Sequence, residues 1–153
     1  MSKAFTSEET AEVPDLVVPR APLPAGVPNY VTSRGLALLR DELEALRSEP
    51  PSPALAQRRL PLEQRIASAE LVRIPTESLE IVRFGATVGV VGDTGERRYQ
   101  IVGVDEADPA RGLLAFSSPL ARALLGHAPG DVVRLRAPRG DEQLEITSVR
   151  YAS

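Results

Sequence analysis

The side chains that most often catalyse reactions or hold metals are scarce in this sequence. There is no cysteine, and the one histidine, His127, lies in the turn-like segment 126–130. A metal site of nitrogen or sulfur donors needs several such ligands together, so His127 is interpreted as a solvent-facing loop residue. Ser117 and Ser118 form a hydroxyl pair, but no GxSxG motif surrounds them and no base lies nearby in the sequence. We therefore expect no catalytic residue.

Carboxylates are the other candidates for chemistry, because hard cations such as Mg²⁺ take oxygen ligands. Asp105, Glu106 and Asp108 lie close together, and Glu49 lies in the proline-rich segment 48–53. A bound cation needs several oxygens held in place, and nothing in the sequence supplies the remaining ligands of either group. The acidic loop is interpreted as a solvated turn, and we expect neither a metal site nor a cofactor.

The serine pair lies at the start of a predicted short helix. Ser118 is a candidate helix cap, and Pro119 suits the first helical turn, where its missing N–H costs nothing. Apolar residues then recur on one face, and Gly126 can supply a left-handed residue after the helix. Residues 129–131, Pro-Gly-Asp, predict a turn into the next strand.

Three segments are predicted along the chain. Residues 1–29 combine acidic side chains with five prolines, which favours a disordered tail of unassigned function. Residues 30–73 are predicted to form a short antiparallel helical hairpin, a truncated coiled coil, because leucines recur at spacings of three and four before prolines interrupt them. The second helix is predicted from Pro53 to about Val72, with Pro61 kinking it or delaying its regular part.

Residues 74–153 are predicted to form a domain of strands and one helix, because apolar residues there alternate with a period of two. Turn signals separate the strands, which are expected at residues 86–91, 98–104, 113–116, 132–136 and 144–151. Direct strand-to-strand turns without repeated βαβ units favour an antiparallel-dominated sheet. The predicted fold class is therefore α+β, with the short helix packed on one side of the sheet.

Composition limits the functional classes further. The chain has 153 residues, 42% hydrophobic and 25% charged, with a formal net charge of −3. This acidic balance argues against a dedicated nucleic-acid binder, which needs a concentrated Lys/Arg surface. No apolar run approaches the length of a membrane span, and the start has no signal-peptide pattern, so a cytoplasmic location without a membrane partner is expected.

The C-terminal half resembles one known family. The stretch SSPLARALLG at residues 117–126, followed by GDVV at 130–133, is similar to the C-terminal domain of the GreA/GreB transcript-cleavage factors. Segments 84–88, 99–103 and 149–151 resemble the same domain. The resemblance implies an FKBP-like sheet that docks at the secondary channel of RNA polymerase. By resemblance, Ser117, Ser118, Pro119 and Arg122 would meet the polymerase.

The N-terminal half resembles the family with a departure. Residues 30–46 are similar to the first coiled-coil helix, but the predicted helices are much shorter than in cleavage factors. In that family the hairpin tip carries an acidic motif that helps to hold Mg²⁺, whereas here the tip offers Glu49 alone. A shortened arm also resembles nucleoside diphosphate kinase regulator-type relatives. The resemblance implies a regulator without transcript-cleavage stimulation, which meets nucleic acid only within the transcription complex.

Two other classes stay open at this stage. An FKBP-like sheet is compatible with a peptidyl-prolyl isomerase, although six aromatic residues and no tryptophan make an aromatic-lined proline pocket hard to assemble. A leucine hairpin that dimerises would instead make the chain an adaptor. The favoured reading is a transcription elongation regulator that is not an enzyme and takes no small-molecule substrate.

Overall fold

The computed structural model describes residues 20, 22–73, 80–136, 138 and 140–151. The predicted tail therefore lies mostly outside the described residues. The chain divides into two compact units. The first holds Leu39–Ser68 and the described residues up to Pro22, and the second holds Leu23–Leu38 and the described residues from Ala69 onward. No helix in the described ranges has the length and apolar character needed to cross a membrane.

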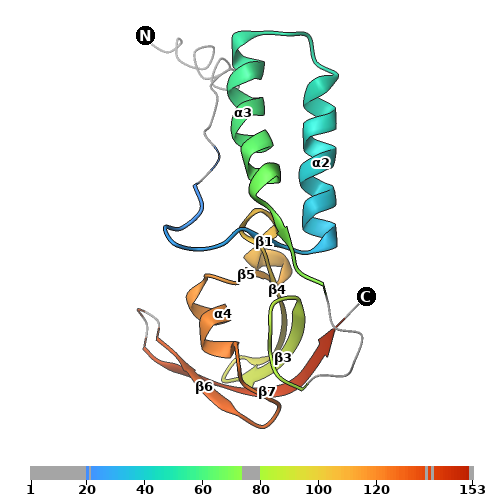
Figure 1. The fold of residues 1–153 in the computed structure, drawn as a ribbon. Helices are drawn as coiled ribbons and strands as arrows, with labels where there is room; N and C mark the ends of the chain where they lie inside the picture. Colours follow the sequence, from blue (N-terminus) through green and yellow to red (C-terminus); the bar gives the residue numbers. More distant parts are fainter. Residues whose placement is uncertain (1–19, 21, 74–79, 137, 139, 152–153) are drawn as a thin grey trace, which may run out of the picture. The chain divides into compact units, whose positions relative to one another are not determined.

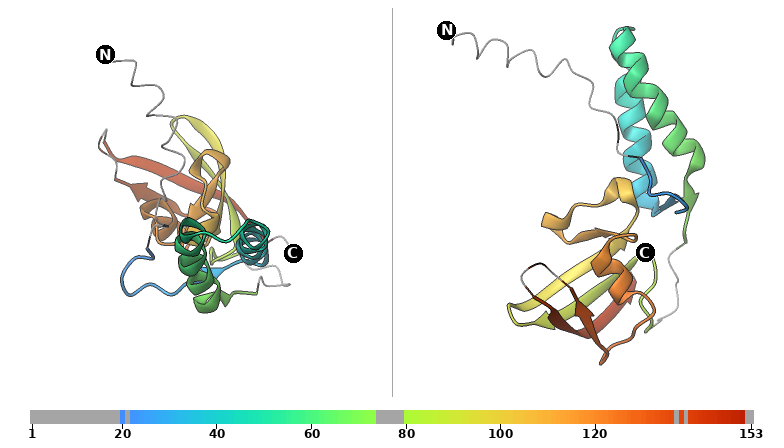
Figure 2. Two further views of the ribbon diagram at one scale, coloured as in Figure 1. Left: turned by 90° about the horizontal axis from the view of Figure 1, so that it is seen from above. Right: turned by 90° about the vertical axis from the view of Figure 1, so that its left-hand side faces the viewer.

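The helical hairpin consists of α2 (Ser33–Arg47) and α3 (Pro53–Ser68), which lie side by side (Figures 1 and 2). The predicted hairpin is thus confirmed. In the first unit, buried leucines from both helices form the seam. These are Leu39, Leu43, Leu46, Leu55 and Leu62. The Ser52 hydroxyl caps α3 by accepting a hydrogen bond from the Leu55 N–H at 3.0 Å.

The second helix differs from its prediction at two points. It runs without interruption from Pro53, with Pro61 in its interior, so the regular part is not delayed. It also ends at Ser68 rather than near Val72. The following residues, Glu70–Leu71 (β2), pair in parallel with Tyr30–Val31 (β1). Backbone pairing with a distant segment is invisible to helical periodicity, and it stops the helix early.

The second unit is built on a five-stranded sheet. Its spatial order is β5-β4-β3-β7-β6, and every neighbouring pair is antiparallel except β4 with β5. The strands are β3 (Ala86–Gly92), β4 (Gly95–Val102), β5 (Leu113–Ala115), β6 (Val132–Leu135) and β7 (Glu142–Tyr151). The predicted α+β class with an antiparallel-dominated sheet is confirmed.

The connections follow the sequence signals with one addition. Asp93 and Thr94 form the tight turn between β3 and β4, and Gly95 beside them has a φ of +108°, which glycine adopts readily. Between β4 and β5 the chain forms two 3₁₀ turns, η2 (Val104–Glu106) and η3 (Pro109–Arg111). The parallel β4–β5 pair needs such a crossover, because a two-residue hairpin joins only antiparallel strands.

The core of the second unit lies between the sheet and the single helix α4 (Pro119–Leu124). Ala121 and Leu124 of α4 are fully buried, and they pack with Val88, Val90 and Ile146 from the central strands. Residues of a strand alternate between two faces, so Thr87, Gly89 and Val91 belong to the opposite face of β3. One face of the sheet therefore carries α4, and the other carries mainly polar residues.

Candidate functional site

The segment between β5 and α4 has the geometry that its residue types predict. Ser118 is extended, with φ −71° and ψ 155°, and its Oγ accepts a hydrogen bond from the Ala121 N–H at 3.3 Å. Pro119 occupies the first helical turn. After the helix, Gly126 has a φ of +85° and donates its N–H to the Val82 carbonyl at 2.8 Å. The cap and the left-handed glycine thus fix both ends of α4.

The four predicted contact residues lie within residues 117–122 and differ in exposure. Pro119 and Arg122 are exposed, whereas Ser117 and Ser118 are half-buried. Positions three apart share a side of a helix, so Pro119 and Arg122 lie on the same outward side of α4. Arg122 forms no hydrogen bond or ion pair with any described residue. An exposed proline beside a free guanidinium, on a helix whose other side is buried, is a suitable surface for a protein partner.

Three aromatic rings, those of Tyr30, Phe84 and Phe116, pack together at the start of the segment that leads to α4. Phe116 directly precedes Ser117, and its ring lies 5.3 Å from that of Tyr30 and 5.6 Å from that of Phe84, measured between centroids. Tyr30 and Phe84 lie 5.9 Å apart, edge to face. Such pairs contribute about 0.5–1.5 kcal/mol each beyond the burial of their area. The rings pack on one another, which anchors the loop that leads to α4.

Tyr151, the last residue of β7, binds the backbone of the segment that leads into β3. The Tyr151 hydroxyl donates to the Ile81 carbonyl and accepts from the Arg83 N–H at 3.0 Å. Burial raises the pKa of Tyr151. Val82, between these partners, donates its N–H to the His127 carbonyl at 2.8 Å. Residues 81–83 therefore join the end of β7 to the loop after α4.

A buried polar cluster occupies the acidic loop, which the sequence predicted to be solvated. Glu106 is only 7% exposed, and its Oε1 accepts a hydrogen bond from the Thr32 hydroxyl at 2.6 Å. The Thr32 Oγ1 in turn accepts from the Gly35 N–H at 2.9 Å, and Arg34 lies 3.6 Å from Glu106 Oε2. The prediction was wrong for Glu106 because its hydrogen-bond partner Thr32 is 74 positions away in the sequence.

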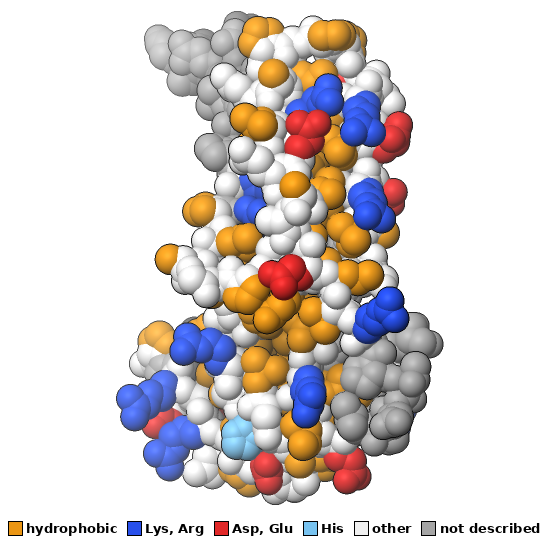
Figure 3. Space-filling view, viewed as in Figure 1, with side chains coloured by type: hydrophobic (Ala, Val, Ile, Leu, Met, Phe, Trp, Pro, Cys, Tyr) orange, Lys and Arg blue, Asp and Glu red, His pale blue; other side chains and the backbone are white. Residues whose placement is uncertain are grey.

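Glu49 at the hairpin tip forms an ion pair with Arg58. Arg58 holds both of its carboxylate oxygens, with Nη1–Oε1 at 3.0 Å and Nη2–Oε2 at 3.1 Å. Within the described ranges, no group of three or more His, Asp or Glu residues is arranged to hold a metal ion. Pro50, Pro51 and Pro53 are exposed beside Glu49, together with Ser48 and Ser52, and Figure 3 shows apolar side chains at the tip. The tip thus offers apolar surface in place of a free carboxylate.

Two of the three acidic residues of α2, Glu42 and Glu44, are also paired with arginines. Glu44 lies 3.9 Å from Arg47, as the helical spacing predicts. Glu42 pairs instead with Arg20, which no short-range spacing indicates. These exposed pairs stabilise the helix by well under 1 kcal/mol each. The carboxylates of Glu42 and Glu44 are therefore already bound by arginines.

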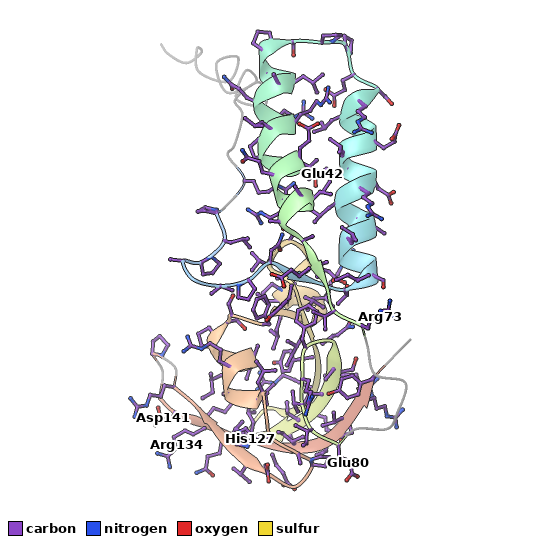
Figure 4. The ribbon with its side chains drawn as sticks, in the orientation of Figure 1. Glu42, Arg73, Glu80, His127, Arg134 and Asp141 are labelled. Carbon is purple, nitrogen blue, oxygen red and sulfur yellow. The ribbon has the colours of Figure 1, made fainter. Side chains whose placement is uncertain are left out.

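His127 and Asp131 form a small exposed cluster in the turn after α4 (Figure 4 labels His127). Asp131 Oδ2 accepts from the Ala128 N–H at 2.9 Å and lies 3.3 Å from His127 Nδ1. The Ala128 N–H, and after it His127, lower the pKa of Asp131 below its ordinary value of 3.8. Both side chains are about half exposed, and the pair holds the turn.

This lowered pKa predicts how pH affects the turn. A carboxyl group whose pKa is lower in the folded state contributes stability above its unfolded pKa, and that contribution is lost as the pH falls through the folded pKa. Asp131→Asn is therefore expected to lower the melting temperature at neutral pH, with the difference from wild type closing as the pH falls through the lowered pKa of Asp131. Thermal melts from pH 2 to 7 measure this difference. Asp141→Asn, at an exposed position (Figure 4) with no polar partner among the described residues, is the control; a difference for Asp131→Asn that does not depend on pH contradicts the prediction.

Comparison with known proteins identifies relatives of the second unit. Residues 77–151 match the family model described as "Transcription elongation factor, GreA/GreB, C-term". Proteins named transcription elongation factor GreA from Paracoccus denitrificans and Acidiphilium cryptum are 47% and 44% identical to this chain over 92 residues. The alignments cover 59% of this chain and 58% and 59% of those relatives, so the chain matches about three-fifths of their length.

Solved structures of two related factors are also similar to the chain. GreA factor homolog 1 from Thermus thermophilus is 21% identical, with a TM-score of 0.42, covering 81% of this chain and 99% of that protein. A prokaryotic transcription elongation factor GreA/GreB from Nitrosomonas europaea is 25% identical, with a TM-score of 0.44, covering 80% and 98%.

Proposed function

Because this chain belongs, through residues 77–151, to the GreA/GreB family of transcription elongation factors, we propose that it binds bacterial RNA polymerase at the secondary channel. The contact surface is the start of α4, with Ser117, Ser118, Pro119 and Arg122. The protein acts as a regulator in the cytoplasm, and it meets nucleic acid only within the transcription complex.

One observation supports the docking role most directly. Pro119 and Arg122 are exposed on a helix whose opposite side, Ala121 and Leu124, is fully buried. The Ser118 cap and the Phe116 ring restrict the loop before the helix. A surface held in one conformation loses little conformational entropy on binding, which favours affinity. Arg122, free of partners among the described residues, can pair with a carboxylate of the partner.

The hairpin tip supports a role without transcript cleavage. Holding a second Mg²⁺ takes carboxylates with free oxygens placed together. At this tip, Arg58 already binds both oxygens of Glu49, and the surrounding residues 48–53 are prolines and serines. We therefore expect the protein to bind RNA polymerase without stimulating cleavage of the RNA. Its role would then be to regulate transcription.

A binding assay with core RNA polymerase tests the docking surface. The immobilised full-length protein is expected to retain the polymerase, and Arg122→Ala is expected to weaken binding about tenfold, since an interfacial charge-assisted contact contributes about 1.5–3 kcal/mol. Arg134→Ala is the matched control, because Arg134 is exposed on β6 and, by strand alternation, faces away from the core in which the neighbouring Val133 packs with α4. Failure of the wild-type protein to bind would refute the proposal. Equal losses for both variants would refute the assignment of the surface.

A further inference from the structure

The sheet face opposite α4 has a hollow over the central strand. Gly89 lies in the middle of β3, with Arg98 of β4 paired on one side and Ser148 of β7 on the other. The β3–β7 register shifts between Gly89 and Val90, so Thr147 is an extra residue that bulges from β7. A glycine inside a strand and a bulge beside it are two features that often occur where a ligand approaches the backbone.

Two hydroxyl groups converge on the space above Gly89. A Cβ atom placed on this glycine would lie 2.6 Å from Ser148 Oγ and 3.0 Å from Thr147 Oγ1. Both oxygens are therefore aimed at the same small region. Neither hydroxyl forms a hydrogen bond within the described residues. Each can donate one hydrogen bond to a ligand.

Of the charged side chains near the hollow, Arg97 has hydrogen-bond partners, whereas Arg98 and Glu96 have none among the described residues. Arg97 is bound to Glu142 at 2.8 Å and to Tyr99 at 3.2 Å. Arg98 is exposed and has no hydrogen bond or ion pair with any described residue. Glu96, two positions before Arg98 on the same face of β4, is also exposed and without such a partner. One free guanidinium and one free carboxylate thus lie along one side of the hollow.

The hollow is open to solvent and has a volume of about 310 Å³; it is lined by Gly89, Glu96, Arg98, Thr147 and Ser148, with their chain neighbours Val90 and Arg97. We propose that the hollow binds a phosphoryl group on a ligand that also carries a hydrogen-bond donor, the chemistry of a nucleoside monophosphate. Arg98 and the two hydroxyls donate to the phosphoryl oxygens, because a guanidinium fork matches phosphate geometry. Glu96 accepts from the donor group of the ligand. None of residues 117–122 lines the hollow, so the site is independent of the proposed docking surface.

Titration of the full-length protein with guanosine 5′-monophosphate, followed by amide NMR and calorimetry, tests the site. Saturable binding is expected, with the largest shifts at Gly89 and Ser148. Arg98→Gln is expected to weaken binding at least tenfold. Arg134→Gln, an exposed arginine on β6 outside the hollow, is expected to leave it unchanged. Unperturbed amide spectra of the free variants show that each is folded.

Inorganic phosphate, as a second probe, separates the roles of the two charges. Glu96→Gln is expected to weaken binding of the nucleotide severalfold while not weakening binding of phosphate, because the carboxylate repels the anion and binds only the donor. Three results would overturn the proposal: no saturable binding of the nucleotide, equal losses for Arg98→Gln and Arg134→Gln, or nucleotide binding that is indifferent to Glu96→Gln.

Discussion

Replacement of Gly103 by alanine is expected to lower the free energy of unfolding of the second unit by about 3 kcal/mol or more. An added Cβ would lie 2.3 Å from the Tyr30 carbonyl oxygen and 3.5 Å from Val31 Cα. Both neighbours are backbone atoms of β1, so no flexible side chain can move aside. The φ of Gly103 is −77°, which alanine adopts freely, so the cost comes from the clash alone.

Urea unfolding followed by circular dichroism measures this loss. Ala110→Ser, at an exposed position in η3, is the control and is expected to change stability by less than about 0.5 kcal/mol. Displacement of β1 would also disturb the Tyr30 ring in the aromatic cluster, which a loss of near-ultraviolet dichroism would report. A Gly103→Ala variant as stable as wild type would show that β1 does not lie against Gly103, which follows the end of β4.

The second large effect is expected for Leu124→Ala. Leu124 has no exposed surface, and it packs α4 against the core of the sheet. Truncation of such a leucine removes apolar contacts and leaves a cavity, which costs about 2–5 kcal/mol. We expect a loss in this range by urea unfolding. Because α4 carries the proposed contact residues, its loosening should also weaken polymerase binding.

Leu60→Ala is the matched comparison, because Leu60 is 57% exposed on α3. It is expected to cost less than about 1 kcal/mol, since little apolar area is returned to water. A similar loss for Leu60→Ala and Leu124→Ala would contradict the assignment of α4 to the core.

Local signals in the sequence were sufficient for much of the fold. The Ser118 cap, Pro119 in the first turn and Gly126 after the helix are each short-range features, and all three have the predicted geometry. The strands of the sheet follow alternating apolar residues, which depend only on neighbouring positions. These elements could be predicted because each residue's role is set within a few positions of it.

Features that join distant segments could not be predicted in the same way. Glu106 is buried because Thr32 donates to it, and the pairing of β1 with β2 ends α3 at Ser68. The pairing of Glu49 with Arg58 likewise depends on the hairpin that brings them together. In the candidate site, the exposure of Pro119 and Arg122 is visible only once α4 is packed. The hollow over Gly89 depends on a register shift, which no pattern of residue types reveals.

One measurement tests the central claim, which is docking without cleavage. Backtracked transcription complexes are supplied with a GreA factor and increasing amounts of this protein, and the cleaved RNA is quantified on a gel. Displacement of the factor from a shared surface predicts that cleavage falls toward the level seen without any factor, and that Arg122→Ala requires about tenfold more protein for the same effect. Cleavage that stays constant would contradict the docking, and cleavage that rises when the protein is added alone would contradict the inactive tip.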